Sequence, residues 1–177
     1  MNYLIYQVKN KRGKIEISSN IHLHTSVIFQ GKGKLILDDD VTLGIELGGS
    51  PKQPILLQPR GSESIIIIGK GTFIANGTDI IAKEKISIGA NCLIGARTTI
   101  IDSDFHGINV SKRNTSGETK SVFIDNNVWL GIGVTILKGV NIGYGAIVGA
   151  GTVVTKDIPN FAIVIGNPMK IIGYANE

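Results

Sequence analysis

A six-residue period is the feature that most restricts how this chain can fold. From Ile88 onward an aliphatic residue recurs at every sixth position, with one interruption between Ile100 and Ile124. The positions are Ile88, Ile94, Ile100, Ile124, Leu130, Ile136, Ile142, Val148 and Val154. A period of six fits neither an amphipathic helix nor a simple alternating strand. It fits short β-segments joined by tight turns, which stack through parallel pairing into a solenoid with a one-dimensional core.

The fifth residue of each hexad agrees with this arrangement, because it is small or branched almost throughout. These residues are Cys92, Thr98, Val128, Val134, Val140, Ala146, Thr152 and Ile158. A glycine directly follows the aliphatic position in five of the nine hexads, as tight corners favour. The exception at the fifth position is Asp104, and there the repeat breaks off.

The first half of the chain shows the same rhythm less regularly. Aliphatic or aromatic residues share one phase at Ile17, Leu23, Phe29, Leu35 and Val41, and the rhythm resumes at Ile68, Ile74 and Ile80. We therefore expect one all-β solenoid domain over residues 1–177, with coils from about 14 to 166. Protrusions are expected near 48–63 and 102–121. Residues 159–177 are expected to form a short C-terminal cap, because an open solenoid end invites association.

Composition limits the classes of partner. Only 18% of the residues are charged and the net charge is +4, with lysine and arginine dispersed, so we expect no nucleic-acid partner. The small positive surplus suits an anionic ligand. The single cysteine excludes an intramolecular disulfide framework. Since no apolar run is long enough for a transmembrane helix and the N-terminus lacks a signal-peptide pattern, we expect a soluble, cytoplasmic protein.

The interruption of the repeat is polar and carries a histidine. Asp102 and Asp104 require partners if they face a dry core, and His106 lies at the apolar-flanked base of this loop. An imidazole has a suitable pKa for a general base near neutral pH. A carboxylate of Asp102 or Asp104, or a backbone carbonyl in place of both, would orient the ring. The non-catalytic interpretation is a loop histidine with a structural hydrogen bond.

Three segments carry a resemblance to a known family. They read IGANCLIGARTTI, FIDNNVWLGIGVTILKGVNIGYGAIVGAGTVVTKDIP and IGNPMKII. This pattern resembles the hexapeptide-repeat acyltransferases over residues 86–172. Within them it is most similar to the sugar O-acetyltransferase branch, which includes galactoside, maltose, capsule and O-antigen acetyltransferases. The resemblance implies a parallel left-handed β-helix, a homotrimer with its active site at the subunit interface, and acetyl-CoA as the donor.

The resemblance also implies roles for individual residues. His106 matches the catalytic base, and the NNVW match places Asn127 and Trp129 beside the acceptor. The residues implied for the CoA donor are Gly131, Ala150, Thr155, Lys156 and, near the phosphates, Lys170. Ile132 departs from the pattern, since relatives often carry a small polar residue there. For Trp129, packing against the 102–121 loop or across the trimer seam is the alternative.

Two further features invite site assignments that we consider weaker. His22 and His24 lie on one face of an expected strand, but a zinc site needs a third ligand, so no metal is expected. Cys92 occupies the small inward position of its hexad, which favours a buried structural thiol over an acyl-cysteine nucleophile. Direct transfer in a ternary complex is therefore expected.

The resemblance, together with the polar loop that carries His106, therefore implies an acetyl-CoA-dependent acyltransferase that acetylates a hydroxyl of a sugar or a surface-polysaccharide precursor. N-acetylation of an amino sugar or a nucleotide-linked sugar is the alternative within enzymes, and a histidine in this loop favours oxygen as the acceptor. A non-catalytic solenoid scaffold is the second alternative. Such a scaffold would give no reason for the long polar loop with His106.

Overall fold

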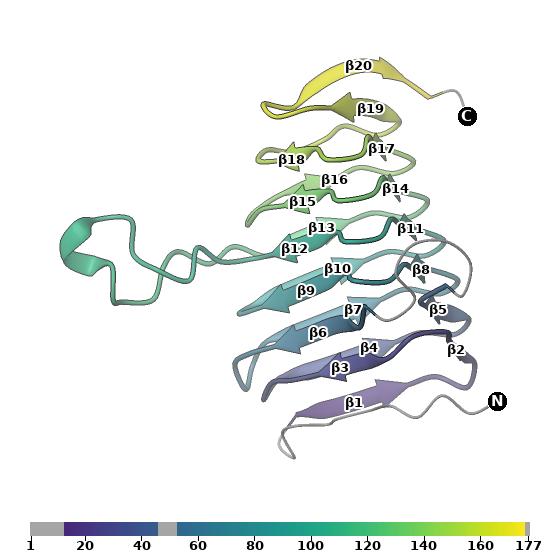
Figure 1. Cartoon of the computed structure of the whole chain (residues 1–177), viewed down its shortest axis with the longest axis horizontal. Helices are drawn as coiled ribbons and strands as arrows, with labels where there is room; N and C mark the ends of the chain where they lie inside the picture. Colours follow the sequence, from purple (N-terminus) through teal and green to yellow (C-terminus); the bar gives the residue numbers. More distant parts are fainter. Residues whose placement is uncertain (1–12, 46–52, 176–177) are drawn as a thin grey trace.

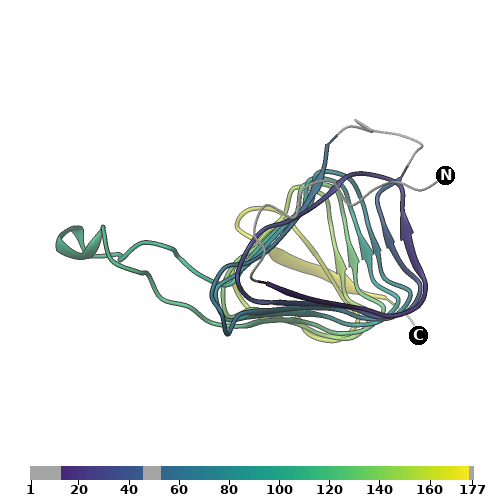
Figure 2. The same cartoon turned by 90° about the horizontal axis from the view of Figure 1, so that it is seen from below.

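The chain folds into a prism of triangular section, whose three walls are parallel β-sheets (Figures 1 and 2). The structure is a computed structural model that describes residues 13–45 and 53–175. Sheet A contains, in order, β1 (Lys14–Ile17), β4 (Lys34–Leu37), β7 (Ile65–Ile68), β10 (Lys85–Ile88), β13 (Val122–Ile124) and β16 (Asn141–Ile142). Sheet B contains β2 (Ile21–Leu23), β5 (Val41–Leu43), β8 (Phe73–Ile74), β11 (Leu93–Ile94), β14 (Trp129–Leu130), β17 (Ile147–Val148), β19 (Ala162–Ile165) and β20 (Lys170–Tyr174). Sheet C contains β3 (Val27–Phe29), β6 (Ile55–Pro59), β9 (Asp79–Ala82), β12 (Thr99–Ile101), β15 (Thr135–Ile136) and β18 (Val153–Val154).

The six-residue period becomes three columns of aliphatic side chains, one inside each wall. In sheet A the register places Ile68, Ile88, Ile124 and Ile142 on successive coils, and all four are buried. Adjacent coils lie about 4.8 Å apart, so each column packs side chain on side chain. Burying each of these side chains contributes about 2 kcal/mol. The one-dimensional core that the period predicts is confirmed.

The phase assigned to the first coils is wrong after Phe29. The register pairs Ile17 with Leu37, so Leu37, and not Leu35 as the six-residue count predicts, continues the column. Leu35 is also buried, at the second inward position of β4. The coil between these partners is two residues longer than three hexads, because its corner around Gly33 is extended. Strict six-residue counting therefore fails in this region.

The protrusion expected near 48–63 is also revised. Residues 46–52 lie outside the described part of the chain, but Ile55–Pro59 form β6, a regular strand of sheet C. The flanking prolines are typical of a loop, yet Pro59 pairs at the end of β6, beyond the last paired residue of β3. A strand end tolerates proline because no ladder bond from its nitrogen is needed there.

The second protrusion forms an arm, which we define as residues 102–121. It leaves the prism between β12 and β13, at the vertex where sheets C and A meet, and carries the 3₁₀ turn η1 (Val110–Lys112) near its tip (Figures 1 and 2). Ile88 and Ile124 pair directly across this insertion. At the C-terminal end, β20 pairs antiparallel with β19. No helix in the described residues is long and apolar enough to cross a membrane.

Candidate active site on the arm

Asp102 anchors the arm to the coil below it. Its side chain is fully buried, and its two carboxylate oxygens accept hydrogen bonds from the backbone N–H groups of Lys83 and Glu84, each at 2.7 Å. A buried carboxylate is tolerated only with such partners. The partners that a buried Asp102 requires are therefore these two backbone amides, which lie in the coil below the base of the arm.

Two segments of the arm run side by side away from this anchor. The N–H of Asp104 donates to the carbonyl of Glu118 at 3.0 Å, and that of Lys120 to the carbonyl of Asp102 at 2.8 Å. At Gly117 the segments touch: a Cβ there would lie 2.4 Å from the carbonyl oxygen of His106, so only glycine fits without displacement. The position of His106 is thus tied to both segments.

The imidazole of His106 is exposed and is oriented by a backbone group. Its Nδ1 lies 2.9 Å from the carbonyl oxygen of Arg113. A carbonyl only accepts, so this contact assigns the proton of the neutral ring to Nδ1 and leaves a lone pair on Nε2. Of the alternatives that the sequence left open for orienting the ring, the carbonyl is the one in hydrogen-bond contact with it. The carboxylate of Asp104 instead contacts the Lys138 ammonium at 3.2 Å.

A cluster of charges surrounds the base of the arm. Glu118 forms ion pairs with Lys120 at 2.9 Å and with Lys138 at 3.0 Å. The hydrogen bonds from Lys120 and Lys138 lower the pKa of the Glu118 carboxyl. In turn, the hydrogen bond to Glu118 raises the pKa of the Lys138 ammonium. The Glu118 carboxylate and the Lys138 ammonium are therefore both charged at neutral pH.

Asn127 and Trp129 lie on the other side of the prism from the arm. Trp129 belongs to sheet B, the wall opposite the vertex from which the arm leaves, and Asn127 is in the corner before it. Trp129 is 53% exposed, so its expected outward position is confirmed. It stands in an outward row with Phe73, Leu93, Ile147 and Ile163. One chain therefore does not bring Trp129 together with His106.

The residues predicted to bind CoA are also divided. Gly131 and Ala150 stack directly at the vertex between sheets B and C, where a Cβ on Gly131 would lie 2.6 Å from the nitrogen of Ala150. Thr155 and Lys156 follow β18 at the vertex of the arm and are exposed. Lys170 begins β20 at the C-terminal end of the solenoid. Ile132, the departure from the pattern, is exposed beside Gly131.

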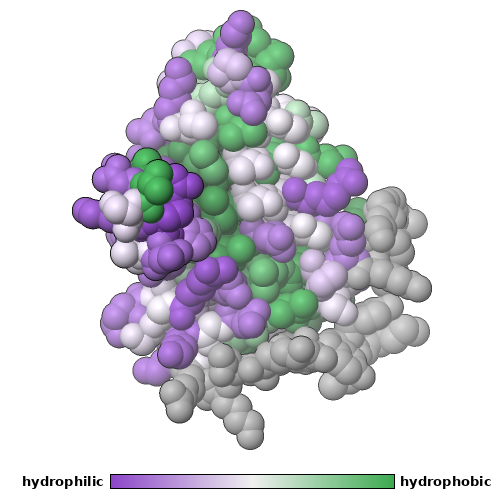
Figure 3. All heavy atoms as spheres, turned by 60° about the vertical axis from the view of Figure 1, so that its left-hand side comes forward, coloured by the Kyte–Doolittle hydropathy of each residue, from purple (hydrophilic) through white to green (hydrophobic). Residues whose placement is uncertain are grey.

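The surface of the arm is mostly polar but has an apolar group. Figure 3 shows the arm end-on, with hydrophilic atoms around a small hydrophobic cluster. The large apolar side chains exposed on the arm are Ile108 at 75% and Val110 at 85%. These two side chains add exposed apolar area to an otherwise polar arm.

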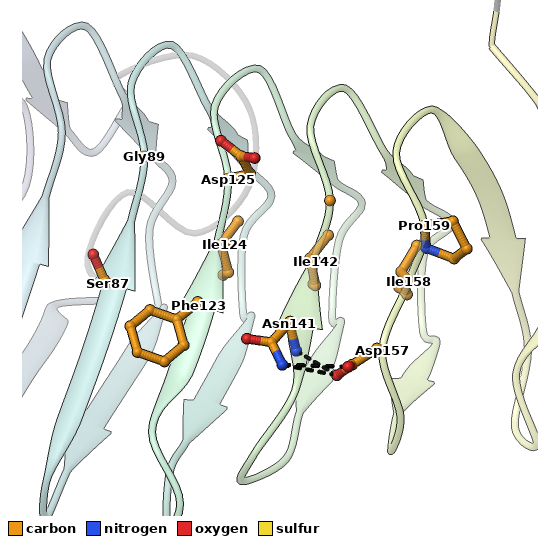
Figure 4. Close-up of a pocket in the computed structure, with 11 residues that line it drawn as sticks. Ser87, Gly89, Phe123, Ile124, Asp125, Asn141, Ile142, Asp157, Ile158 and Pro159 are labelled. Carbon is orange, nitrogen blue, oxygen red and sulfur yellow. Dashed lines mark hydrogen bonds between the residues drawn. The ribbon is translucent and has the colours of Figure 1, made fainter.

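A hollow of about 630 Å³ lies on the outer side of sheet A (Figure 4). It is lined by Ser87, Gly89, Phe123, Ile124, Asp125, Asn141, Ile142, Gly143, Asp157, Ile158 and Pro159. Within the hollow, Asn141 donates hydrogen bonds to the carboxylate of Asp157 from its backbone N–H at 2.7 Å and from its side-chain amide at 3.2 and 3.3 Å. None of the residues predicted for catalysis or donor binding lines it. No sequence motif marks this hollow, because its lining residues occupy ordinary positions of the hexads.

Cys92 and the two early histidines have the surroundings expected of structural residues. Cys92 is fully buried, with its Sγ 3.1 Å from the carbonyl of Asp125, which confirms its inward position. Burial raises the pKa of the Cys92 thiol, so it is protonated at neutral pH. His22 and His24 are exposed. Among residues 13–45 and 53–175, no three potential metal ligands lie together.

Known proteins match both the repeat and the fold. A family described as "Hexapeptide repeat of succinyl-transferase" matches residues 85–112 and 121–156. The galactoside O-acetyltransferase of Escherichia coli (strain K12) is 30% identical over 169 residues, which cover 96% of this chain and 80% of that protein. The chain belongs to the hexapeptide-repeat acyltransferases. Its similarity within them is to the sugar O-acetyltransferase branch.

Solved structures agree with this placement. The polySia specific acetyltransferase NeuO superposes with a TM-score of 0.74 and 29% identity, covering 94% of this chain and 70% of that one. A hexapeptide-repeat acetyltransferase of Vibrio cholerae, complexed with acetyl-CoA, gives a TM-score of 0.60 at 32% identity over 63% of this chain and 61% of its own. The parallel left-handed β-helix is confirmed. Over the repeat region, the chain spans about half the length of several curated relatives that it matches.

Proposed function

We propose that this protein transfers an acetyl group from acetyl-CoA to a hydroxyl group of a sugar. The observation that carries the proposal is His106, exposed on the arm, with Nδ1 bonded to the carbonyl of Arg113 and Nε2 left as an acceptor. A base in this tautomer is suited to remove a proton from a hydroxyl group. The similarity to galactoside O-acetyltransferase, and to acetyltransferases solved in complex with acetyl-CoA or with CoA, supports the same reaction.

In the proposed reaction His106 acts first as a base and then as an acid. Its Nε2 accepts the hydroxyl proton while the hydroxyl oxygen attacks the thioester carbonyl. The tetrahedral intermediate expels the CoA thiolate, the C–S bond breaks, and the imidazolium returns the proton to sulfur. The Arg113 carbonyl holds Nδ1–H throughout and stabilises the imidazolium. Transfer is direct in this proposal, because the thiol of Cys92 is fully buried and its pKa is raised, which does not suit a nucleophile.

The donor would bind along the upper coils. The stacked backbone at Gly131 and Ala150 offers a surface for the pantetheine amides, and Thr155 and Lys156 lie exposed further along. Ammonium groups such as those of Lys156 and Lys170 attract the phosphates of CoA. These residues lie at different vertices of one chain, so we assign the complete donor site to a seam between two subunits.

The same division supports a homotrimer. His106 leaves the prism at the vertex opposite the wall that carries Trp129, so one chain cannot present both residues to a single acceptor. In a closed ring of three, the arm of one subunit reaches the sheet B of the next, and each contact is heterologous. The exposed Ile108 and Val110 on the arm, and the apolar row on sheet B, are suited to that contact.

The acceptor class follows from the relatives and from the chemistry of the base. The names of the two relatives specify a galactoside and polysialic acid, both of which present sugar hydroxyls. We therefore propose a hydroxyl of a sugar or a surface-polysaccharide precursor, acetylated in the cytoplasm, where acetyl-CoA is available. Asp102 and Asp104 are assigned to holding the arm, and Asn127 and Trp129 to the acceptor.

Calorimetric titration with acetyl-CoA, followed by an acceptor screen, tests this function. We expect micromolar binding, weakened about tenfold in Lys156→Ala because a charged contact to phosphate is lost. His106→Ala is expected to lower turnover by about two to four orders of magnitude and to leave donor binding unchanged. His22→Ala, on a distant coil, is the control. Turnover that survives in His106→Ala would refute the mechanism.

A further inference from the structure

Lys138 joins the arm to the coil above it. It follows β15, and its ammonium lies 3.2 Å from the Asp104 carboxylate and 3.0 Å from that of Glu118. Asp104 belongs to the outgoing segment of the arm and Glu118 to the returning segment. One side chain therefore holds both segments against the solenoid. Its own side chain is only 20% exposed, less than those of either partner.

The contact with Asp104 lies one hydrogen bond away from His106. The carbonyl of Asp104 accepts the N–H of His106 at 2.7 Å, and the N–H of Asp104 donates to Glu118 at 3.0 Å. At the level of Gly117 the two segments pack without room for a side chain. A shift of Asp104 or Glu118 is therefore passed to the backbone of His106.

We propose that Lys138 is a positioning residue for His106: it fixes both segments of the arm on the solenoid, and so sets where the imidazole stands relative to the substrates. The proposal rests on the proposed role of His106. Asp102 anchors the arm from below and Lys138 from above, so the two contacts together fix its direction. Positioning matters because small displacements of a catalytic group have large effects on rate.

Lys120 provides a matched control on the same carboxylate. It pairs with Glu118 at 2.9 Å, but its side chain is 59% exposed and its ion pair stays within the returning segment of the arm. Changing either lysine to methionine removes one positive charge beside Glu118 and keeps a side chain of similar length. Only Lys138→Met also removes the link to Asp104 and to the solenoid.

Hydrogen–deuterium exchange tests the structural part without reference to any activity. The unmodified protein, Lys138→Met, Lys138→Arg and Lys120→Met are compared by mass spectrometry over peptides within 102–121. We expect exchange in these peptides to be faster by about threefold or more in Lys138→Met, as loss of a partly buried pair implies. Lys138→Arg and Lys120→Met are expected to match the unmodified protein. Unchanged exchange in Lys138→Met would overturn the proposal.

Kinetics tests the catalytic consequence. In Lys138→Met we expect kcat to fall about tenfold while the Kd for acetyl-CoA stays within about twofold, because the base is displaced and the donor groove is intact. Arginine at this position restores kcat. An unchanged kcat in Lys138→Met, or an equal loss in Lys120→Met, refutes the positioning role. Failure of the proposed role of His106 gives a different result. His106→Ala would then keep full turnover, while exchange in the arm would still be faster in Lys138→Met.

Discussion

Replacing Asp102 by alanine is expected to loosen the arm and to destabilise the fold. The substitution deletes the acceptor of two N–H groups, those of Lys83 and Glu84, each bonded at 2.7 Å. Hydrogen bonds to a charged group contribute about 1.5–3 kcal/mol each, and donors left buried without a partner cost about 1–3 kcal/mol. Because the two bonds share one carboxylate and are not additive, we expect a loss of about 3 kcal/mol in the free energy of unfolding.

The assay is urea denaturation followed by circular dichroism, at one protomer concentration because assembly contributes to stability. Asp125→Ala is the control: it removes an exposed carboxylate whose bond is to the next residue, Asn126, and is expected to cost less than about 1 kcal/mol. Trypsin should also cut after Lys112 or Arg113 faster in Asp102→Ala. Equal free energies of unfolding for the two variants would refute the reasoning about Asp102.

Two further predictions concern the thiol and the tryptophan. Burial raises the pKa of Cys92, so the stability it contributes is complete below the ordinary thiol pKa and is lost as pH rises above it. The fall in unfolding free energy from neutral to alkaline pH should therefore be smaller in Cys92→Val than in the unmodified protein. An equal fall in the two proteins would contradict this. The protein has one tryptophan, Trp129, so its emission should shift to the blue on assembly. The concentration range over which the subunits dissociate is found by analytical ultracentrifugation. If the emission maximum does not change on dilution through that range, Trp129 lies outside the interface.

The solenoid was predictable because the repeat places one aliphatic residue on the inner side of each wall in every regular coil. That logic failed where the coil length changed: Leu37, not Leu35, continues the column after Phe29, and no local signal marks the longer corner. It failed again at Ile55–Pro59, where prolines typical of loops lie at the ends of a regular strand. In both places the pairing of distant coils overrides the local pattern.

For the candidate site, sequence identified the arm and His106 but not what holds them. A carboxylate near a histidine in sequence suggests a partner that orients the imidazole. The structure shows that Asp102 instead bonds two backbone amides of the coil below. Lys138 carries no motif, since its contacts depend on how the returning segment of the arm lies. The residues assigned to the donor and the acceptor fall at separate vertices, a division that a linear motif does not reveal.

The direct pairing of Ile88 with Ile124 makes the arm an interchangeable part. Beyond the anchor Asp102, the coils above and below stack as though the rest of the arm were not there, so the hydrophobic core does not depend on what is inserted at that vertex after the anchor. Closing a longer or shorter loop between fixed ends changes the free energy only slowly with its length. Arms of other lengths and sequences can therefore be exchanged at this point, and with them the catalytic group and its reach, while the scaffold stays the same.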